Sequence, residues 1–300
     1  MTFVPSFPKK VQYLLSFSFS EVTKLCAKTE AEKFVGGRPG YDSDFLFVLL
    51  LIKKVTNWSF RTIAEMGGVS HSTLVRANER FLRKKIYDRF FIHLVKTAYR
   101  KGLIRGKYVA MDSSFVQTFS KKQELGSENW NGFKKAYGFK LHLLIDTETK
   151  MPLALTIGNG IAHDGTLAVP LLKKARPWLK HVGYVLADKG YDDTDIVSWI
   201  AKELKAKAGI PMRKKSKLAK GKKHRYGNLL NWQLKAVGRT FKKSVLRRRT
   251  EVERSFSSIK RTYHLGKEET RGILNFAKNA YLALISHMLK LFYVEGIVCL

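Results

Sequence analysis

Residues 107–119 read K-Y-V-A-M-D-S-S-F-V-Q-T-F, and this stretch decides the fold. Its β-branched and aromatic residues predict a strand. Asp112 lies near the middle of the stretch, although aspartate is disfavoured inside strands. An isolated acid at such a position breaks a local rule, which makes Asp112 a candidate functional residue.

Four further strand patterns and two helical patterns follow. The strands are predicted at 137–146, 151–157, 183–187 and 209–212, and the helices at 165–175 and 192–205. The first two of these strands are joined by a polar turn at 147–150 and form a predicted hairpin. The order strand, strand, strand, helix, strand, helix, strand predicts an α/β domain with a central mixed five-stranded sheet and helices on both faces.

A second isolated acid, Asp188, directly follows the fourth predicted strand. Ligands in open α/β sheets bind outside the carboxyl ends of strands. Two carboxylates brought together there repel each other, and a divalent cation such as Mg²⁺ relieves the repulsion. We therefore predict that Asp112 and Asp188 share a metal site. The nearby pair His163 and Asp164 is interpreted as a loop hydrogen bond and not as a pair of ligands.

A third acid comes from a predicted helix that follows a long stretch without acidic residues, between Glu203 and Glu251. Glu253 shares one helical stripe with Arg249, four residues before it, and Lys260, seven residues after it. Glu251 points roughly 160° away from Glu253. This phase selects Glu253 as the third member of the site.

These residues resemble the DDE-type transposases of insertion sequences, which have a ribonuclease H-like catalytic core. In that family one Asp lies within the first strand, another follows the fourth strand, and a Glu lies on a late helix. Asp112, Asp188 and Glu253 stand in that order, and the run A-D-K-G-Y-D-D resembles the motif around the second Asp. The resemblance implies an α/β fold with a ribonuclease H-like mixed five-stranded sheet.

One branch of the family has a motif around the Glu in which Tyr, Arg, Glu and Lys follow one another, separated by two, three and six residues respectively. This chain has Arg249, Glu253 and Lys260 at those spacings, but Leu246 occupies the position of the Tyr. The phosphate contact of that Tyr is therefore missing, and the subgroup stays open.

The resemblance implies a transposase that cleaves DNA at the ends of its element and transfers the ends into target DNA. Two Mg²⁺ ions, for which Mn²⁺ can substitute, would be held by the triad, with Asp112 bridging both and Asp188 and Glu253 holding one each. Arg249 and Lys260 would bind terminal phosphates. The implied partners are double-stranded DNA and a second copy of the chain, in a homodimer that pairs two element ends.

The N-terminal part, residues 1–103, has mostly helical patterns and is predicted to be an all-α DNA-binding domain that precedes a catalytic domain at 104–300. Helices are predicted at 45–55, at 60–66 and from Ser70 or Ser72 to residue 83, with Gly67 and Gly68 as the break. This pattern resembles a helix-turn-helix, whose second helix would present Arg76 and Arg80 to DNA. The alternative is a plain helical hairpin with a solvated basic face.

The charge balance supports a polyanionic partner, because 56 Lys and Arg against 24 Asp and Glu give a net charge of +32. The segment 213–249 is especially basic, and Lys214, Lys215, Lys222 and Lys223 are predicted to clamp the DNA backbone without reading bases. No apolar stretch reaches the ~18 residues of a membrane-spanning helix. The two cysteines do not suggest a disulfide framework. We therefore expect an intracellular, cytoplasmic protein associated with the nucleoid and not with a membrane.

Two other functions fit the same sequence. A non-catalytic DNA-binding regulator, or a decayed transposase, would use only the helical domain and the charge. An RNA-binding or RNA-cleaving enzyme of the same core fold would need selectivity for the 2′-hydroxyl, which sequence does not show.

Overall fold

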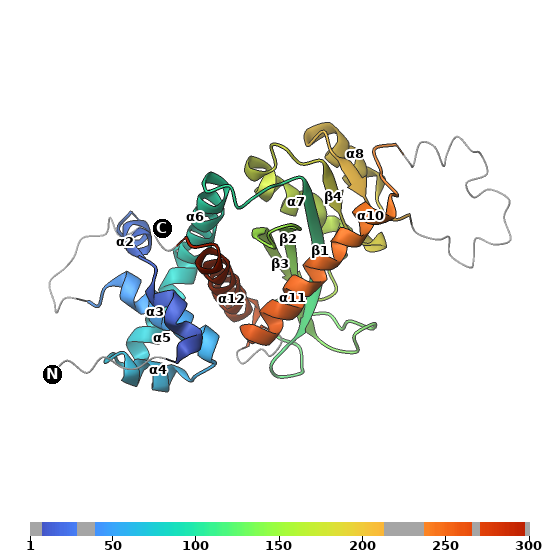
Figure 1. The fold of residues 1–300 in the computed structure, drawn as a ribbon. Helices are drawn as coiled ribbons and strands as arrows, with labels where there is room; N and C mark the ends of the chain where they lie inside the picture. Colours follow the sequence, from blue (N-terminus) through green and yellow to red (C-terminus); the bar gives the residue numbers. More distant parts are fainter. Residues whose placement is uncertain (1–7, 29–39, 213–236, 266–270, 298–300) are drawn as a thin grey trace. The chain divides into compact units, whose positions relative to one another are not determined.

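The computed structural model describes residues 8–28, 40–212, 237–265 and 271–297 (Figure 1). The chain forms two compact units. The first comprises Met1–Lys101, Val116–Phe139 and Ser257–Leu300, and the second comprises Gly102–Phe115 and Lys140–Phe256. Residues 257–300 thus group with the N-terminal helices, although the sequence placed them in the domain 104–300. The limits of the functional domains stay a prediction.

The predicted mixed five-stranded sheet is confirmed. Its strands are β1 (Tyr108–Gln117), β2 (Gly138–Asp146), β3 (Pro152–Asn159), β4 (Tyr184–Leu186) and β5 (Lys207–Gly209). Their order is β3-β2-β1-β4-β5, with β4 parallel to both β1 and β5. The fifth strand lies earlier than the predicted 209–212, because Ala208 pairs with Gly238 and Thr240 while Pro211 has no N–H to donate to a ladder.

Helices lie on both faces of this sheet (Figure 1). They are α7 (Asp164–Ala175), α8 (Thr194–Glu203), α10 (Lys243–Leu246) and α11 (Thr250–Thr262), with short 3₁₀ turns η2 (Arg176–Trp178), η3 (Lys189–Tyr191) and η5 (Arg247–Arg249). Helix α7 packs against β3 and α8 against β5. Helix α8 begins later than the predicted residue 192, because the Asp193 side chain caps it by accepting a hydrogen bond from the Asp195 N–H.

The first unit is built around α12 (Ile273–Val294), which is buried along most of its length. The other helices are α1 (Gln12–Leu15), α2 (Ser20–Ala27), α3 (Ser43–Thr56), α4 (Phe60–Met66), α5 (His71–Arg83) and α6 (Ile86–Arg100), preceded by η1 (Lys9–Val11). Helix α12 packs against α3 and α6, and the Phe47 ring contacts those of Phe81, Tyr87 and Phe90. No helix in the described ranges is both long and apolar enough to cross a membrane.

The predicted helical pair before the sheet is confirmed as α4 and α5. Ser59 caps α4 by accepting from the Thr62 N–H, and Ser70 caps α5 by accepting from the Thr73 N–H. Gly68 lies in the connection with φ +62°, a left-handed conformation that glycine adopts without strain. The two caps and the turn therefore fix where α5 begins and which of its faces is buried.

Candidate functional site

The first two acids belong to neighbouring parallel strands: Asp112 lies in the middle of β1, and Asp188 lies two residues past the end of β4. The β1–β4 register pairs Tyr108 with Tyr184 and Ala110 with Leu186. Two residues further along, the same register places Asp112 beside Asp188. Asp188 Oδ1 accepts a hydrogen bond of 2.6 Å from the Gly190 N–H. A Cβ at position 190 would lie 2.7 Å from that oxygen, so the close approach requires glycine.

Asp112 lies in an environment that disfavours its charge. Its pKa is raised to about 6. Burial is the main cause, the carboxylates of Asp188 and Glu253 contribute to the rise, and the Ser113 N–H and the Arg249 guanidinium oppose it. The Ser113 N–H donates to Asp112 Oδ1 over 2.8 Å. The three predicted acids are therefore electrostatically coupled.

Arg249 joins Asp112 to Glu253. Its Nη2 lies 2.6 Å from Glu253 Oε1, and its Nη1 lies 3.9 Å from Asp112 Oδ2. Glu251 has different partners, Arg254 and the Lys150 ammonium at 3.6 Å. The helical phase thus brings Glu253 and Arg249 to the aspartates and directs Glu251 elsewhere. Among the described residues, no three His, Cys, Asp or Glu side chains are grouped closely enough to hold a metal ion as placed.

The predicted DNA-contacting residues have varied surroundings. Lys260 follows Glu253 by seven residues on α11 and is half-buried; burial and the nearby Lys134 ammonium lower its pKa. On α5, Arg76 is exposed, whereas Arg80 is half-buried and donates to Ser43 Oγ over 3.3 Å. The remaining four, Lys214, Lys215, Lys222 and Lys223, lie outside the described residues.

Leu246, at the position where the family branch has Tyr, ends α10. Its Cδ2 would lie 3.4 Å from a Cβ at Gly209, so this side chain packs near β5. The apolar side chain therefore contributes to packing and not to phosphate binding.

A buried polar cluster next to the aspartates was not predicted. Hydrogen bonds between Thr118 and Tyr137 and between Thr147 and Tyr108 give β1 and β2 one antiparallel register, which sets Ser113 opposite His142. His142 is fully buried, and burial lowers its pKa to about 4, with the Asp164 carboxylate opposing.

Two further side chains complete this cluster. Tyr191 is fully buried, and its pKa is raised by burial and by the carboxylates of Asp164, Asp112 and Asp188. Lys140 forms an ion pair of 3.1 Å with Asp164. His163 accepts from the Gly165 N–H, as the interpretation of the His163–Asp164 pair as a loop hydrogen bond predicted. The sequence did contain one signal for this cluster. Lys140 and His142 are two polar residues at positions i and i+2 of a mostly apolar strand, and such positions lie on the same face of the sheet.

The sheet order, the two aspartates on neighbouring parallel strands and the glutamate on a late helix define a ribonuclease H-like α/β domain with an acidic site. The family model for the transposase DDE domain matches residues 106–289, and the chain belongs to this family of transposases. The match includes Asp112, Asp188 and Glu253.

Two solved structures illustrate the structural comparison. One is a piggyBac transposase synaptic complex with hairpin DNA, with 11% identity, 96% of this chain and 74% of that chain covered, and a TM-score of 0.49. Another is a Mos1 transposase paired-end complex with the left transposon end, with 13% identity, 88% and 82% covered, and a TM-score of 0.26. The comparison with curated proteins gives no match.

Proposed function

We propose that this transposase cleaves DNA at the ends of its element and transfers the ends into target DNA, with Asp112, Asp188 and Glu253 as metal ligands. The observation that supports this proposal most is the β1–β4 register, which, continued by two residues, sets Asp112 within β1 beside Asp188 just after β4. The coupling of Asp112 to Glu253 through Arg249 adds the third acid.

The donor chemistry fits a divalent cation. All three side chains offer carboxylate oxygens, which Mg²⁺ and Mn²⁺ prefer. Burial and, to a smaller extent, the repulsion of the other two carboxylates raise the pKa of Asp112, and a bound cation relieves that repulsion. Two such ions stabilise the attacking and leaving oxygens of a displacement at phosphorus. Binding by all three acids requires Glu253 to exchange the Arg249 guanidinium for the metal.

The remaining residues of the site orient DNA. Once released by Glu253, the Arg249 guanidinium is free to bind a phosphate with two N–H donors. Lys260, on the same helix, supplies a second positive charge along the path of the DNA. Pairing two ends requires a second copy of the chain, so we propose a homodimer acting on double-stranded DNA inside the cell.

The test uses a duplex that carries the terminal repeats flanking the coding region. We expect cleavage with Mg²⁺ or Mn²⁺, none with EDTA, and a loss of at least about 100-fold in Asp112→Ala, Asp188→Ala and Glu253→Gln. Glu251→Gln is the matched control, since it removes the same charge two residues away on the same helix. DNA binding is measured in parallel.

Three results would contradict the proposal. Cleavage that survives all three substitutions would exclude the triad. An equal loss in Glu251→Gln would exclude the specific role of Glu253. Tight binding to the repeats without cleavage by the wild type would favour a non-catalytic regulator.

A further inference from the structure

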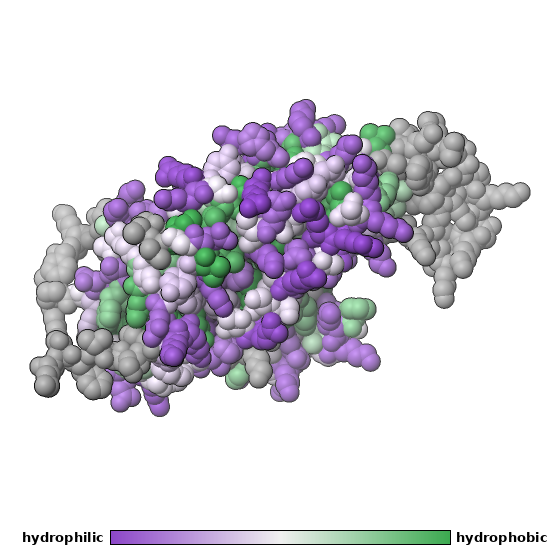
Figure 2. Space-filling view, in the orientation of Figure 1, coloured by the Kyte–Doolittle hydropathy of each residue, from purple (hydrophilic) through white to green (hydrophobic). Residues whose placement is uncertain are grey.

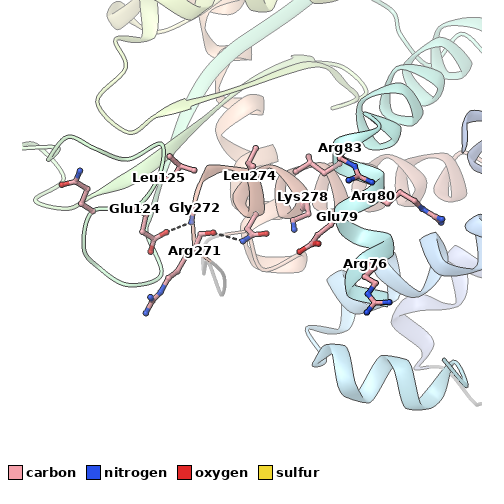
Figure 3. Close-up of a pocket in the computed structure, with 13 residues that line it drawn as sticks. Arg76, Glu79, Arg80, Arg83, Glu124, Leu125, Arg271, Gly272, Leu274 and Lys278 are labelled. Carbon is pink, nitrogen blue, oxygen red and sulfur yellow. Dashed lines mark hydrogen bonds between the residues drawn. The ribbon is translucent and has the colours of Figure 1, made fainter. Parts of the chain in front are cut away.

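A cleft of about 1080 Å³ opens within the first unit, between α5, the start of α12 and the loop of residues 118–137 (Figure 3). Five basic side chains line it: Arg76, Arg80, Arg83, Arg271 and Lys278. The proposed metal site is built from other residues. This cleft therefore needs an explanation of its own.

The basic wall of the cleft comes from one stripe of α5. Arg76 and Arg83 are seven residues apart and lie on the same helical face. Both are exposed, and neither makes an ion pair with any described residue. Arg80, between them, is directed to Ser43 on α3 and is thereby used in packing. Two arginines of the stripe are thus available to an anion.

The opposite wall is held in place by a set of hydrogen bonds. Glu124 Oε1 accepts from the Ser120 N–H and hydroxyl, and its Oε2 accepts from the Gly272 N–H at the start of α12. The Ile273 N–H donates to the Leu125 carbonyl over 2.9 Å. Burial acts against ionisation of Glu124, but these hydrogen bonds and the nearby Arg271 guanidinium lower its pKa. The loop is therefore fixed to the helix, and the Glu124 charge is already compensated.

The charges that remain favour an anionic ligand. Glu79, the other acid of the lining, interacts electrostatically with the Lys278 ammonium. Arg271 is exposed, and so are two leucines that line the same cleft, Leu125 at 71% and Leu274 at 60% exposure. A wall that combines guanidinium groups with exposed leucines suits a phosphodiester strand, whose phosphates are charged and whose sugars are largely apolar.

We propose that this cleft binds the backbone of one DNA strand, with Arg76, Arg83 and Arg271 on the phosphates and Leu125 and Leu274 against the sugars. This inference rests on the proposed function only in taking DNA as the ligand. It changes the role expected of α5, because the Arg76 and Arg83 stripe then binds DNA of any sequence and does not read bases in the major groove.

The test is the salt dependence of DNA binding, measured by fluorescence anisotropy with full-length protein in metal-free buffer. Each phosphate that a cation neutralises contributes about −0.9 to the slope of log affinity against log salt for duplex DNA. The triple variant Arg76→Gln, Arg83→Gln, Arg271→Gln is expected to reduce that slope by roughly 2 to 3. Random-sequence duplex and element-end duplex should lose affinity alike, by about 10-fold or more near physiological salt.

Matched controls separate the cleft from the general charge. Arg89→Gln with Arg100→Gln removes two exposed arginines of α6 that do not line the cleft, and its slope should stay within about 0.5 of the wild type. Leu125→Ser with Leu274→Ser should weaken binding by about threefold or more at an unchanged slope. Thermal unfolding verifies that each variant is folded.

Three outcomes would overturn the proposal. The first is a triple variant with the wild-type slope, and the second is an α6 control that lowers the slope as much as the triple variant does. The third is a loss confined to the element-end duplex, which would show base reading by α5. None of these outcomes depends on cleavage. The cleavage rate of Asp112→Ala therefore tests the triad, and the salt slope of the triple variant tests the cleft, so failure of one proposal is distinguishable from failure of the other.

Discussion

Replacing Asp112 by Asn should stabilise the metal-free protein while it abolishes cleavage. The Asp112 side chain is 20% exposed, and its pKa rises from 3.8 to about 6 on folding. At about 1.4 kcal/mol per pKa unit, ionisation of this carboxyl costs roughly 3 kcal/mol more in the folded protein than in the unfolded chain. Asparagine has nearly the same shape and carries no charge, so it avoids this cost.

The sign of the effect follows from the raised folded-state pKa. Below about pH 3 the carboxyl is mostly protonated in both states, and the Asn variant and the wild type should be equally stable. As the pH rises from about 4 to 6, the carboxyl ionises in the unfolded chain while it stays protonated in the folded protein. The wild type therefore loses stability relative to Asp112→Asn over this range, and the difference levels off near pH 7. Urea unfolding at pH 4, 5, 6 and 7 in EDTA measures it.

Two comparisons make this reasoning refutable. Asp195→Asn removes an exposed carboxylate in the first turn of α8, where it favours the helix dipole, and should destabilise by less than about 1 kcal/mol. Added Mg²⁺ should stabilise the wild type and not Asp112→Asn. An Asn variant that is less stable than the wild type at pH 7, or a difference that does not change with pH, would refute the argument.

Three further predictions concern side chains around the site. Arg239→Met should lower the free energy of unfolding in urea by about 3–5 kcal/mol. It leaves the Asp192 carboxylate, which is 1% exposed, without the guanidinium that lies 2.7 Å away. The double variant with Asp192→Leu should recover most of the lost stability. The wild type should lose up to roughly 3 kcal/mol of unfolding free energy as the pH falls from 6.5 to 4, because the His142 pKa of about 4 in the folded protein makes protonation favour the unfolded chain. His142→Leu should abolish this loss. Equal acid sensitivity of the variant and the wild type would contradict the prediction. Gly190→Ala should lower the cleavage rate by about 10- to 100-fold with a small change in melting temperature, because its Cβ displaces the Asp188 carboxylate; unchanged cleavage would contradict it.

The regular elements could be predicted because local rules determine them. Helix α4 has the predicted bounds of 60–66, since Ser59 and the glycine pair mark both ends in the sequence. The starts of α8 and β5 were misplaced because contacts distant in sequence contribute to both, in addition to the Asp193 cap at α8. Asp192 is drawn from the helix by Arg239, 47 residues later, and Ala208 pairs with a segment thirty residues further on. Periodicity within a window of residues does not contain such pairings.

The sequence was sufficient to choose the residues of the candidate site, but it was not sufficient to predict their contacts. Strand context and helical phase selected Asp112, Asp188 and Glu253, whose roles as ligands stay predictions. The buried cluster of His142 and Tyr191 was missed, because it forms only when β2 lies beside β1 and the fold brings Tyr191 of η3 near Asp112 and Asp164. Figure 2 shows why charge alone is a weak guide to sites: hydrophilic side chains cover most of the visible surface.

The three consecutive arginines of η5 explain how Glu253 reaches the sheet at all. The Arg248 guanidinium lies 4.2 Å from the Tyr108 ring centroid and 3.4 Å from Glu148 Oε1, so it contacts the start of β1 and the β2–β3 turn together. Arg249 then reaches Asp112, four residues along the same strand. These contacts dock the first turn of α11 against β1. A single helical turn from Arg249 therefore sets Glu253 near Asp112, so the basic run has a role in placing an acid.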